Sequence, residues 1–268
     1  MTEDIEYEED VGEENLALWV IVKSGNNLFG FDASIVGNML VIPEITHIPG
    51  EIEYMPGTIT VRGSILPFVD LRVYTGQKSA EQEIDEFCQL MDQRLSDHQH
   101  WLNELKSSID ENREFTLATD PHKCAFGKWY DKYKSEDRTI KTILAKFDAP
   151  HKVIHGIAEK VAKLVHENKV EEAHEIIDRT SKCEMARMVS LFSDIKEAVR
   201  EVGRRRIAMV LETEKGPIAL DIDEVVSVEQ ISNIEDAPKK QSSSTGISRI
   251  GRRAEDDDMV LLMENLAF

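Results

Sequence analysis

The chain has 268 residues, 41% of them hydrophobic, and a formal net charge of −19 at pH 7. A chain of this length and composition can bury one or two hydrophobic cores, and its strong negative charge excludes nucleic acid as an expected partner, because the phosphate backbone would be repelled. The sequence has no run of about 18 apolar residues and opens on acidic residues rather than on a secretion signal, so we expect no membrane insertion and a cytoplasmic location.

The first part of the chain changes from an acidic tail to short β-type segments. Residues 1–14 carry eight acidic side chains and no basic one, which predicts a disordered tail over residues 1–15. From about residue 17, runs rich in valine, isoleucine and aromatic residues alternate with turn signals, as in ALWVIVKSGNN, NLFGFD and TITVRGSILPFVDLR. We therefore predict β-structure over residues 16–79.

The rest of the chain predicts helices and then a return to strands. Residues 80–204 carry apolar side chains at alternating spacings of three and four, the pattern of amphipathic helices. Strand-like runs resume in RIAMVLETEKGPIALDIDEVVSVEQI, within residues 205–268. The simplest account is a helical domain inserted into a surface loop of one β-domain, because neighbouring loop ends tolerate an insertion. The expected fold class is α+β with more than one domain.

The helical part concentrates side chains that bind metals. Seven of the eight histidines lie between His98 and His174, together with Cys124 in the run HKCAFGKWY. His98 takes one position of an apolar helical stripe, and His151 and His155 are four residues apart, so both project from one face of a helix. Neutral imidazole and thiolate are the groups that bind a borderline-soft ion such as zinc. These residues are therefore candidate metal ligands.

Both strand-rich segments resemble the CheW-like domains of bacterial chemotaxis. The first half of that family is matched by FDASIVGNMLVIPEITHIPG and ITVRGSILPFVDLR, and the second half by RIAMVLETEKGPIALDIDEVVSVEQI with the closing DMVLLMENL. The resemblance implies a pair of small five-stranded β-barrels, the first from residues 16–79 and the second from residues 205–268, with the insertion between them. The family's barrels bind chemoreceptors and the histidine kinase CheA, and the residues that match its partner-binding motif are Val61, Arg62 and Ile65.

The helical segment resembles a second family, the chemoreceptor zinc-binding (CZB) domain. Three elements carry the likeness: D-H-x-x-W from Asp97 to Trp101, C-x-F-G-x-W-Y from Cys124 to Tyr130, and the later pair of histidines. The resemblance implies a four-helix-bundle-like domain over residues 80–204 that binds one Zn²⁺ ion. The implied ligands are His98, Cys124, His151 and His155. Three imidazoles and one thiolate fill a tetrahedral zinc ion and leave no position for water, which favours holding or sensing over hydrolysis.

Other residues of this segment have simpler interpretations. Surface exposure is the expectation for four histidines, namely His100, His122, His166 and His174. The first two of these are the alternative ligands if the implied set is wrong. Cys88 and Cys183 lie in amphipathic helices, where cysteine is most simply a small buried hydrophobic residue. The helix that carries the paired histidines is expected to have Pro150 in its first turn and Asp148 as its cap.

The resemblances imply a non-enzymatic adaptor that couples chemoreceptors to CheA. A zinc peptidase would need the H-E-x-x-H motif, which HKVIH, HENKV and HEIID all lack, and the chain has no phosphate-binding glycine loop. Cys124 is the expected redox-sensing residue, because thiolates react with oxidants such as hypochlorous acid, and zinc occupancy itself is the alternative stimulus. A cytosolic zinc-buffering protein with scaffold barrels is the alternative function. Recruitment to polar receptor arrays and a homodimer through the helical domain are further expectations.

Overall fold

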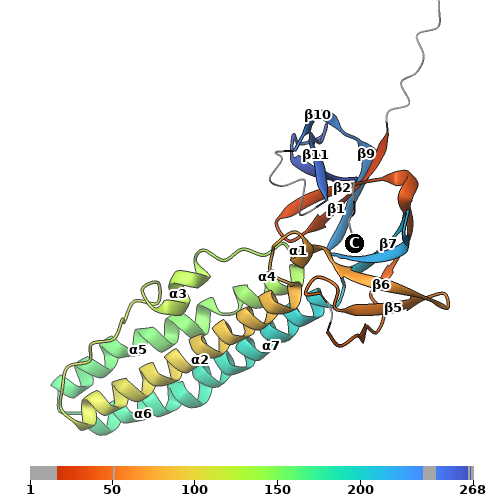
Figure 1. The fold of residues 1–268 in the computed structure, drawn as a ribbon. Coiled ribbons are helices and arrows are strands. Elements are labelled where there is room, and N and C mark those ends of the chain that lie inside the picture. Colours follow the sequence, from red (N-terminus) through yellow and green to blue (C-terminus); the bar gives the residue numbers. More distant parts are fainter. Residues whose placement is uncertain (1–16, 51, 238–245, 265, 267–268) are drawn as a thin grey trace, which may run out of the picture. The chain divides into compact units, whose positions relative to one another are not determined.

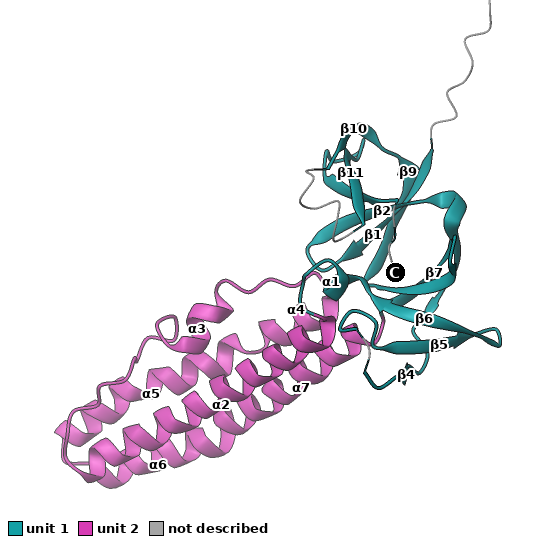
Figure 2. Ribbon diagram, in the orientation of Figure 1, with its two compact units in different colours: residues 1–78, 206–268 teal, residues 79–205 magenta. Residues whose placement is uncertain are grey.

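The computed structural model describes residues 17–50, 52–237, 246–264 and 266, and the predicted acidic tail of residues 1–15 lies outside them. The chain divides into two compact units (Figure 2), one formed by residues 1–78 with 206–268 and the other by residues 79–205. We refer to them as the sheet unit and the helical unit. The chain thus leaves the sheet unit once, forms the helices, and returns to it.

The sheet unit takes its strands from both ends of the chain. Before the helices come β1 (Leu18–Ser24), β2 (Asn27–Asp32), a 3-10 turn (Ala33–Ile35), β3 (Val36–Val41), β4 (Thr46–His47), β5 (Gly57–Val61), β6 (Ser64–Asp70) and the short helix α1 (Leu71–Tyr74). After them come β7 (Ile207–Thr213), β8 (Gly216–Ile222), β9 (Glu224–Gln230), β10 (Ser232–Asp236), β11 (Ile247–Arg252) and β12 (Met259–Met263).

The strand pairing corrects the prediction that each half of the sequence forms its own five-stranded barrel. The described strands form two six-stranded sheets with the orders β10-β11-β12-β2-β1-β9 and β3-β7-β8-β6-β5-β4 (Figure 1), and each sheet mixes strands from both halves. β1 pairs with β9 and β3 with β7 in antiparallel fashion, while β12 runs parallel to β2 and β6 parallel to β8. A period-two pattern identifies a strand and its faces but not its partner, so this exchange was invisible in the sequence.

The insertion point follows from the same topology. The helical unit leaves after β6 and α1 and returns at β7, and all of the strands that flank it belong to the second sheet. The helical unit is therefore inserted between two strands of the same sheet. The family resemblance had implied an insertion between two barrels, and this expectation is wrong. The two sheets share a buried core, in which Val20 and Phe31 of the first sheet pack with Val69, Met209 and Leu220 of the second. Burial of such side chains contributes roughly 1.5–3 kcal/mol each.

The helical unit is a bundle of unequal helices. It contains α2 (Ala80–Asp110), α3 (Ala125–Tyr130), α4 (Arg138–Ala145), α5 (Asp148–His166), α6 (Val170–Thr180), a π-helical turn (Ser181–Met185) and α7 (Ala186–Gly203). The π-helical turn joins α6 directly to α7, so three long helical segments and two short helices take the place of four similar ones. Figure 1 shows α2 and α5 alongside the continuous segment formed by α6, the π-helical turn and α7, in agreement with the contacts of α2 with α5, α6 and α7.

Local chemistry explains where α2 begins and which face it buries. The Ser79 hydroxyl accepts a hydrogen bond from the Gln82 N–H, and the Gln82 side chain accepts one from the Ser79 N–H, each at 3.1 Å, which forms a capping box. Along the helix, the buried side chains recur at spacings of three, four and seven. They include Met91, Leu102 and Leu105, and His98 lies on the same stripe, as its spacing predicts.

The first turn of α2 and the last turn of α7 lie next to each other. A Cβ atom at Gly203 would come within 2.3 Å of Cδ1 of Ile84, so the end of the Ile84 side chain lies directly against the Gly203 backbone. Both connections to the sheet unit therefore leave the bundle from the same end. Within the described part of the chain, no helix has the length and apolar character needed to cross a bilayer.

Candidate metal centre

Three helical segments place four metal-binding side chains around one point. His98 lies on α2, Cys124 is the residue before α3, and His151 and His155 lie one turn apart on α5. One potential ligand atom from each residue lies within 4.8 Å of the other three. A tetrahedral zinc ion with bonds of about 2.0–2.3 Å separates its ligand atoms by about 3.3–3.8 Å, so small side-chain movements suffice to close this cluster on one ion.

Hydrogen bonds at Nδ1 of His98 and of His155 leave the Nε2 atom of each ring facing the cluster. Nδ1 of His98 lies 2.7 Å from the Arg94 carbonyl oxygen, and Nδ1 of His155 lies 3.1 Å from the Ala118 carbonyl oxygen. A carbonyl only accepts, so each Nδ1 carries the proton and each Nε2 keeps a free lone pair. Both of these Nε2 atoms are buried and lack a hydrogen-bond partner in the described structure. A metal ion would satisfy both, so these residues fit the zinc ion that the donor set implies.

Burial keeps the three imidazoles neutral. His98, His151 and His155 are 2%, 4% and 1% exposed. Desolvation lowers the pKa of all three, to about 3 for His151 and about 4 for His155, and the neighbouring histidines of the cluster add to the effect at these two. Neutral imidazole is the form that binds a metal, so the histidines need lose no proton at neutral pH.

Cys124 is the accessible member of the cluster. It is half-buried, and its Sγ lies 3.2 Å from Nε2 of His151. The Gly127 N–H donates to the same sulfur at 3.2 Å. Burial raises the pKa of the thiol, whereas the Gly127 and Phe126 N–H groups act in the opposite direction. Without a metal the thiol therefore stays protonated at neutral pH, and metal binding would release its proton.

The backbone around Cys124 requires glycine at position 127. A Cβ atom there would lie 1.9 Å from the Pro121 carbonyl oxygen, far inside van der Waals contact. The sequence suggested that Gly127 allows a sharp turn, and the structure gives the cause as this close approach of two backbone segments.

The prediction that Asp148 caps α5 is wrong. Phe147 precedes the helix without a side-chain cap, and Asp148 takes the first helical position, where it binds Lys152 at 2.9 Å.

Aromatic side chains enclose the cluster. The Phe126 ring contacts the imidazoles of His98 and His151 at centroid distances of 5.6 and 5.0 Å, and the Trp101 ring lies 4.9 Å from His155. Nε1 of Trp101 donates to the Ala118 carbonyl oxygen at 2.8 Å, the same atom that accepts from His155. These contacts fix the orientation of the rings and exclude water from the histidine side of the cluster.

The remaining histidines lie outside the cluster. His100, His122 and His166 are exposed, and His122 contacts Asp131 at 3.0 Å. His174 is half-buried rather than exposed, and its Nε2 lies 3.1 Å from the Asp110 carboxylate. The alternative ligands His100 and His122 are thus not among the four residues that the structure brings together.

The two other cysteines differ from each other. Cys88 is buried on α2, as expected for a small apolar residue. Cys183 was expected to be buried too, but it is exposed in the π-helical turn. The extra residue of a π-helical turn shifts the following side chains around the helix axis, so a regular period assigns Cys183 to the wrong face.

The three residues matched to the partner-binding motif lie at one hairpin of the sheet unit. Val61 and Ser64 pair across a two-residue loop of Arg62 and Gly63, which have φ of 50° and 86°. Positive φ at both loop positions matches the right-handed twist of the strands, although arginine rarely adopts it. Val61 is buried, whereas Arg62 is exposed and Ile65 is 73% exposed. Only the last two could contact a partner without rearrangement.

The residues that orient the histidines were missed in the sequence. The Arg94 carbonyl lies one helical turn before His98, and this spacing could have identified it. The Ala118 carbonyl belongs to an irregular segment without a recognisable pattern. Every residue has a main-chain carbonyl, so the identity of residue 118 does not indicate that its carbonyl accepts hydrogen bonds from both His155 and Trp101. Only the structure could reveal this.

Two family models match the chain, one mainly in the sheet unit and one in the helical unit. The model of the CheW-like domain matches residues 18–94, and that of the chemoreceptor zinc-binding domain matches residues 98–162, which include the whole cluster. No curated protein gives a significant match to the chain. Among solved structures, the scaffolding protein TtCheW from Thermoanaerobacter tengcongensis is similar at 13% identity, covering 93% of this chain and 89% of that chain, with a TM-score of 0.42. The family matches show that the chain carries a CheW-like domain interrupted by a chemoreceptor zinc-binding domain.

Proposed function

We propose that the protein is a chemotaxis adaptor that couples chemoreceptors to CheA and adjusts this coupling through zinc held by His98, Cys124, His151 and His155. The convergence of these four residues within 4.8 Å supports the proposal most directly. Zinc would supply a fixed cross-link between α2, α5 and the segment before α3. A donor set of three imidazoles and one thiolate fills the ion, which favours a sensor over an enzyme.

Cys124 is the residue that could report an oxidant. Its thiolate sulfur can attack the chlorine of hypochlorous acid, so that an S–Cl bond forms, the Cl–O bond breaks, hydroxide leaves and the sulfur gives up two electrons. Hydroxide then displaces chloride from the sulfur, and the net reaction turns thiolate and hypochlorous acid into sulfenic acid and chloride. The segment 118–127 would lose one of its attachments to the cluster, because the oxidised sulfur is a poor metal ligand. The half-buried position of Cys124 leaves room for a small oxidant to approach.

The sheet unit supplies the output in this proposal. The bundle is joined to it at residues 78–79 and 205–206, and both connections leave the same end of the bundle. A change in the packing of α2 against α7 would reach both connections together. Such coupling requires two states of the bundle whose balance zinc or oxidation shifts. The exposed Arg62 and Ile65 are the proposed contacts with a receptor or with CheA.

The test compares binding of the full chain to purified CheA and to a receptor signalling domain under three conditions. These are zinc saturation, zinc removal with a chelator, and zinc saturation followed by hypochlorous acid. The proposal predicts an affinity that changes between conditions, and an oxidant response that Cys124→Ala abolishes. Arg62→Asn is the matched variant for the output, because asparagine tolerates positive φ and lacks both the charge and the long side chain of arginine. It should weaken partner binding and leave zinc affinity unchanged.

Each contrary result has a distinct meaning. Zinc binding without any binding to CheA or to a receptor would contradict the adaptor and favour a zinc-buffering protein. Partner binding that ignores zinc and oxidant would contradict sensing. Full zinc affinity in Cys124→Ala would contradict the assignment of the thiol as a ligand.

A further inference from the structure

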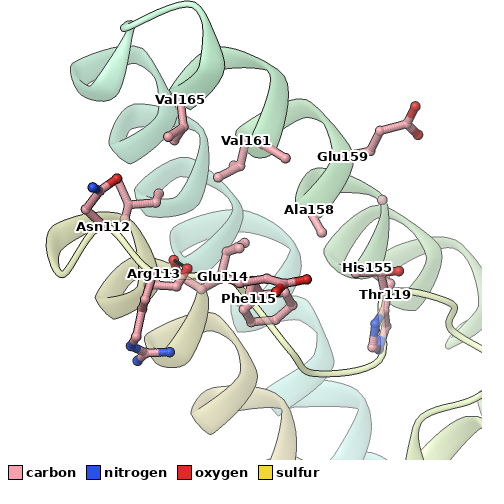
Figure 3. Close-up of a pocket in the computed structure, with 15 residues that line it drawn as sticks. Asn112, Arg113, Glu114, Phe115, Thr119, His155, Ala158, Glu159, Val161 and Val165 are labelled. Carbon is pink, nitrogen blue, oxygen red and sulfur yellow. Dashed lines mark hydrogen bonds between the residues drawn. The ribbon is translucent and has the colours of Figure 1, made fainter.

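The helical unit contains a cavity of about 530 Å³ beside the candidate metal centre. Its walls come from the last turns of α2, from the segment 112–119 and from α5 (Figure 3). His155 forms part of one wall, so the cavity borders the cluster without being part of it. Cavities of about 300–1,000 Å³ are the ones that hold small organic ligands in proteins.

Most of the cavity wall is apolar. Figure 3 shows Ala158, Val161 and Val165 directed from α5 toward Phe115. Leu105 closes the wall on the side of α2. The Phe115 ring is held in place by an edge contact with Trp101 at a centroid distance of 5.1 Å. Such a wall favours an aliphatic or aromatic ligand body, since each apolar contact removes surface from water.

The charges at the cavity favour a cation over an anion. The guanidinium of Arg113 is already bound by Glu104 at 2.5 Å and by Glu111 at 2.6 Å. Glu114 and Glu159 are exposed members of the lining, and neither forms an ion pair with any residue that the structure describes. The negative potential at the rim therefore attracts an ammonium group and repels a carboxylate.

We propose that this cavity binds a small amphipathic cation, with its apolar body between α2 and α5 and its ammonium group at the rim beside Glu114, in the negative potential to which Glu159 adds from the outer side of α5. The proposal does not depend on the function of the metal centre. A bound ligand would touch His155 and the segment that carries Ala118. The cavity therefore gives the helical unit a second binding site next to the first.

Two probes of similar size and opposite charge test the proposal. Binding of 4-phenylbutylamine and of 4-phenylbutyrate to the full zinc-saturated chain is measured by titration calorimetry and by ligand-observed NMR. We expect the amine to bind at least tenfold more tightly than the carboxylate. In the double variant Glu114→Gln and Glu159→Gln, this preference should fall below threefold. Equal binding of the two probes to the wild type, or no binding of either, would overturn the proposal.

Gly156 allows the cavity to be filled without disturbing the helix. It lines the cavity, and a Cβ atom there would meet no other atom within 4 Å. Gly156→Ala should retain amine binding, whereas Gly156→Trp should weaken it more than tenfold. Ala162→Trp is a second filling variant, and Val189→Trp, at an exposed position of α7, is the control that should bind as the wild type does. Unchanged amine binding in both filling variants, with wild-type circular dichroism, would refute the assignment to this cavity.

Discussion

Replacing His98 by phenylalanine should change the stability of the bundle in opposite directions with and without zinc. In the metal-free protein, the buried Nε2 of His98 has no partner, which costs about 1–3 kcal/mol. Phenylalanine removes this cost but also the hydrogen bond from Nδ1 to the Arg94 carbonyl, worth about 0.5–1.5 kcal/mol. The metal-free variant should therefore be about 0.5–1.5 kcal/mol more stable than the metal-free wild type.

Zinc should reverse this order. At a free zinc concentration about a thousandfold above the dissociation constant, the wild type gains about 4.1 kcal/mol. A hundredfold loss of affinity, which can follow even from removing a group that only orients a ligand, would reduce this gain to about 1.4 kcal/mol. The zinc-loaded wild type should then be more stable than the metal-free wild type and more stable than the His98→Phe variant with or without zinc. The difference arises because His98 contributes a bond to the loaded site and only an unsatisfied nitrogen to the empty one.

The measurement is urea unfolding followed by circular dichroism at 222 nm, with buffered zinc and with a chelator. His174→Phe is the matched control, because His174 lies in the same unit, has a buried Nδ1 without a partner, and lies outside the cluster. It should leave the zinc-dependent gain unchanged. If metal-free His98→Phe is less stable than the wild type and responds fully to zinc, His98 is a structural core histidine and the reasoning fails.

Two further predictions concern other parts of the molecule. Gly127→Ala should weaken zinc affinity at least tenfold in chelator competition, because its Cβ would displace Pro121 and the segment that carries Cys124; wild-type affinity would show that the close approach is not required. In the sheet unit, burial raises the pKa of Asp221 to about 7 despite the neighbouring Arg206, whereas an unfolded aspartate has 3.8. Because the folded state holds the proton of Asp221 more tightly than the unfolded state does, this proton stabilises the fold at low pH, and the stabilisation is lost as pH rises through 7. The free energy of unfolding of the sheet unit should therefore be about 1.4 kcal/mol larger at pH 6 than at pH 8. Asp221→Asn should remove this difference, and an NMR titration of the carboxyl group that gives a pKa near 4 would contradict it.

The metal cluster could be predicted to a large extent because its pattern is local. His151 and His155 share a helix face by spacing alone, and His98 occupies a regular position of the apolar stripe on α2. The position of Cys124 relative to them could not be derived from spacing, since an irregular segment connects α2 to α3. There the family motif supplied what periodicity could not.

The pairing of the strands could not be predicted because it is non-local. The parallel pairs β12 with β2 and β6 with β8 join segments separated by more than a hundred residues, and nothing in the sequence of Val69 indicates its partner Leu220. The resemblance to the CheW-like family had instead implied a separate barrel for each half of the chain. The prediction that Cys183 is buried was wrong for a related reason, because one π-helical turn changes the face of the helix on which a residue lies.

X-ray absorption at the zinc K-edge tests most directly whether these four residues hold one closed zinc site. The protein is loaded with one equivalent of zinc, and the nearest atoms around the metal are counted and identified. The account predicts three nitrogen atoms at about 2.0 Å and one sulfur atom at about 2.3 Å, with the sulfur signal lost in Cys124→Ala. A shell of nitrogen and oxygen alone, or a water oxygen in place of one of the four ligands, would contradict it.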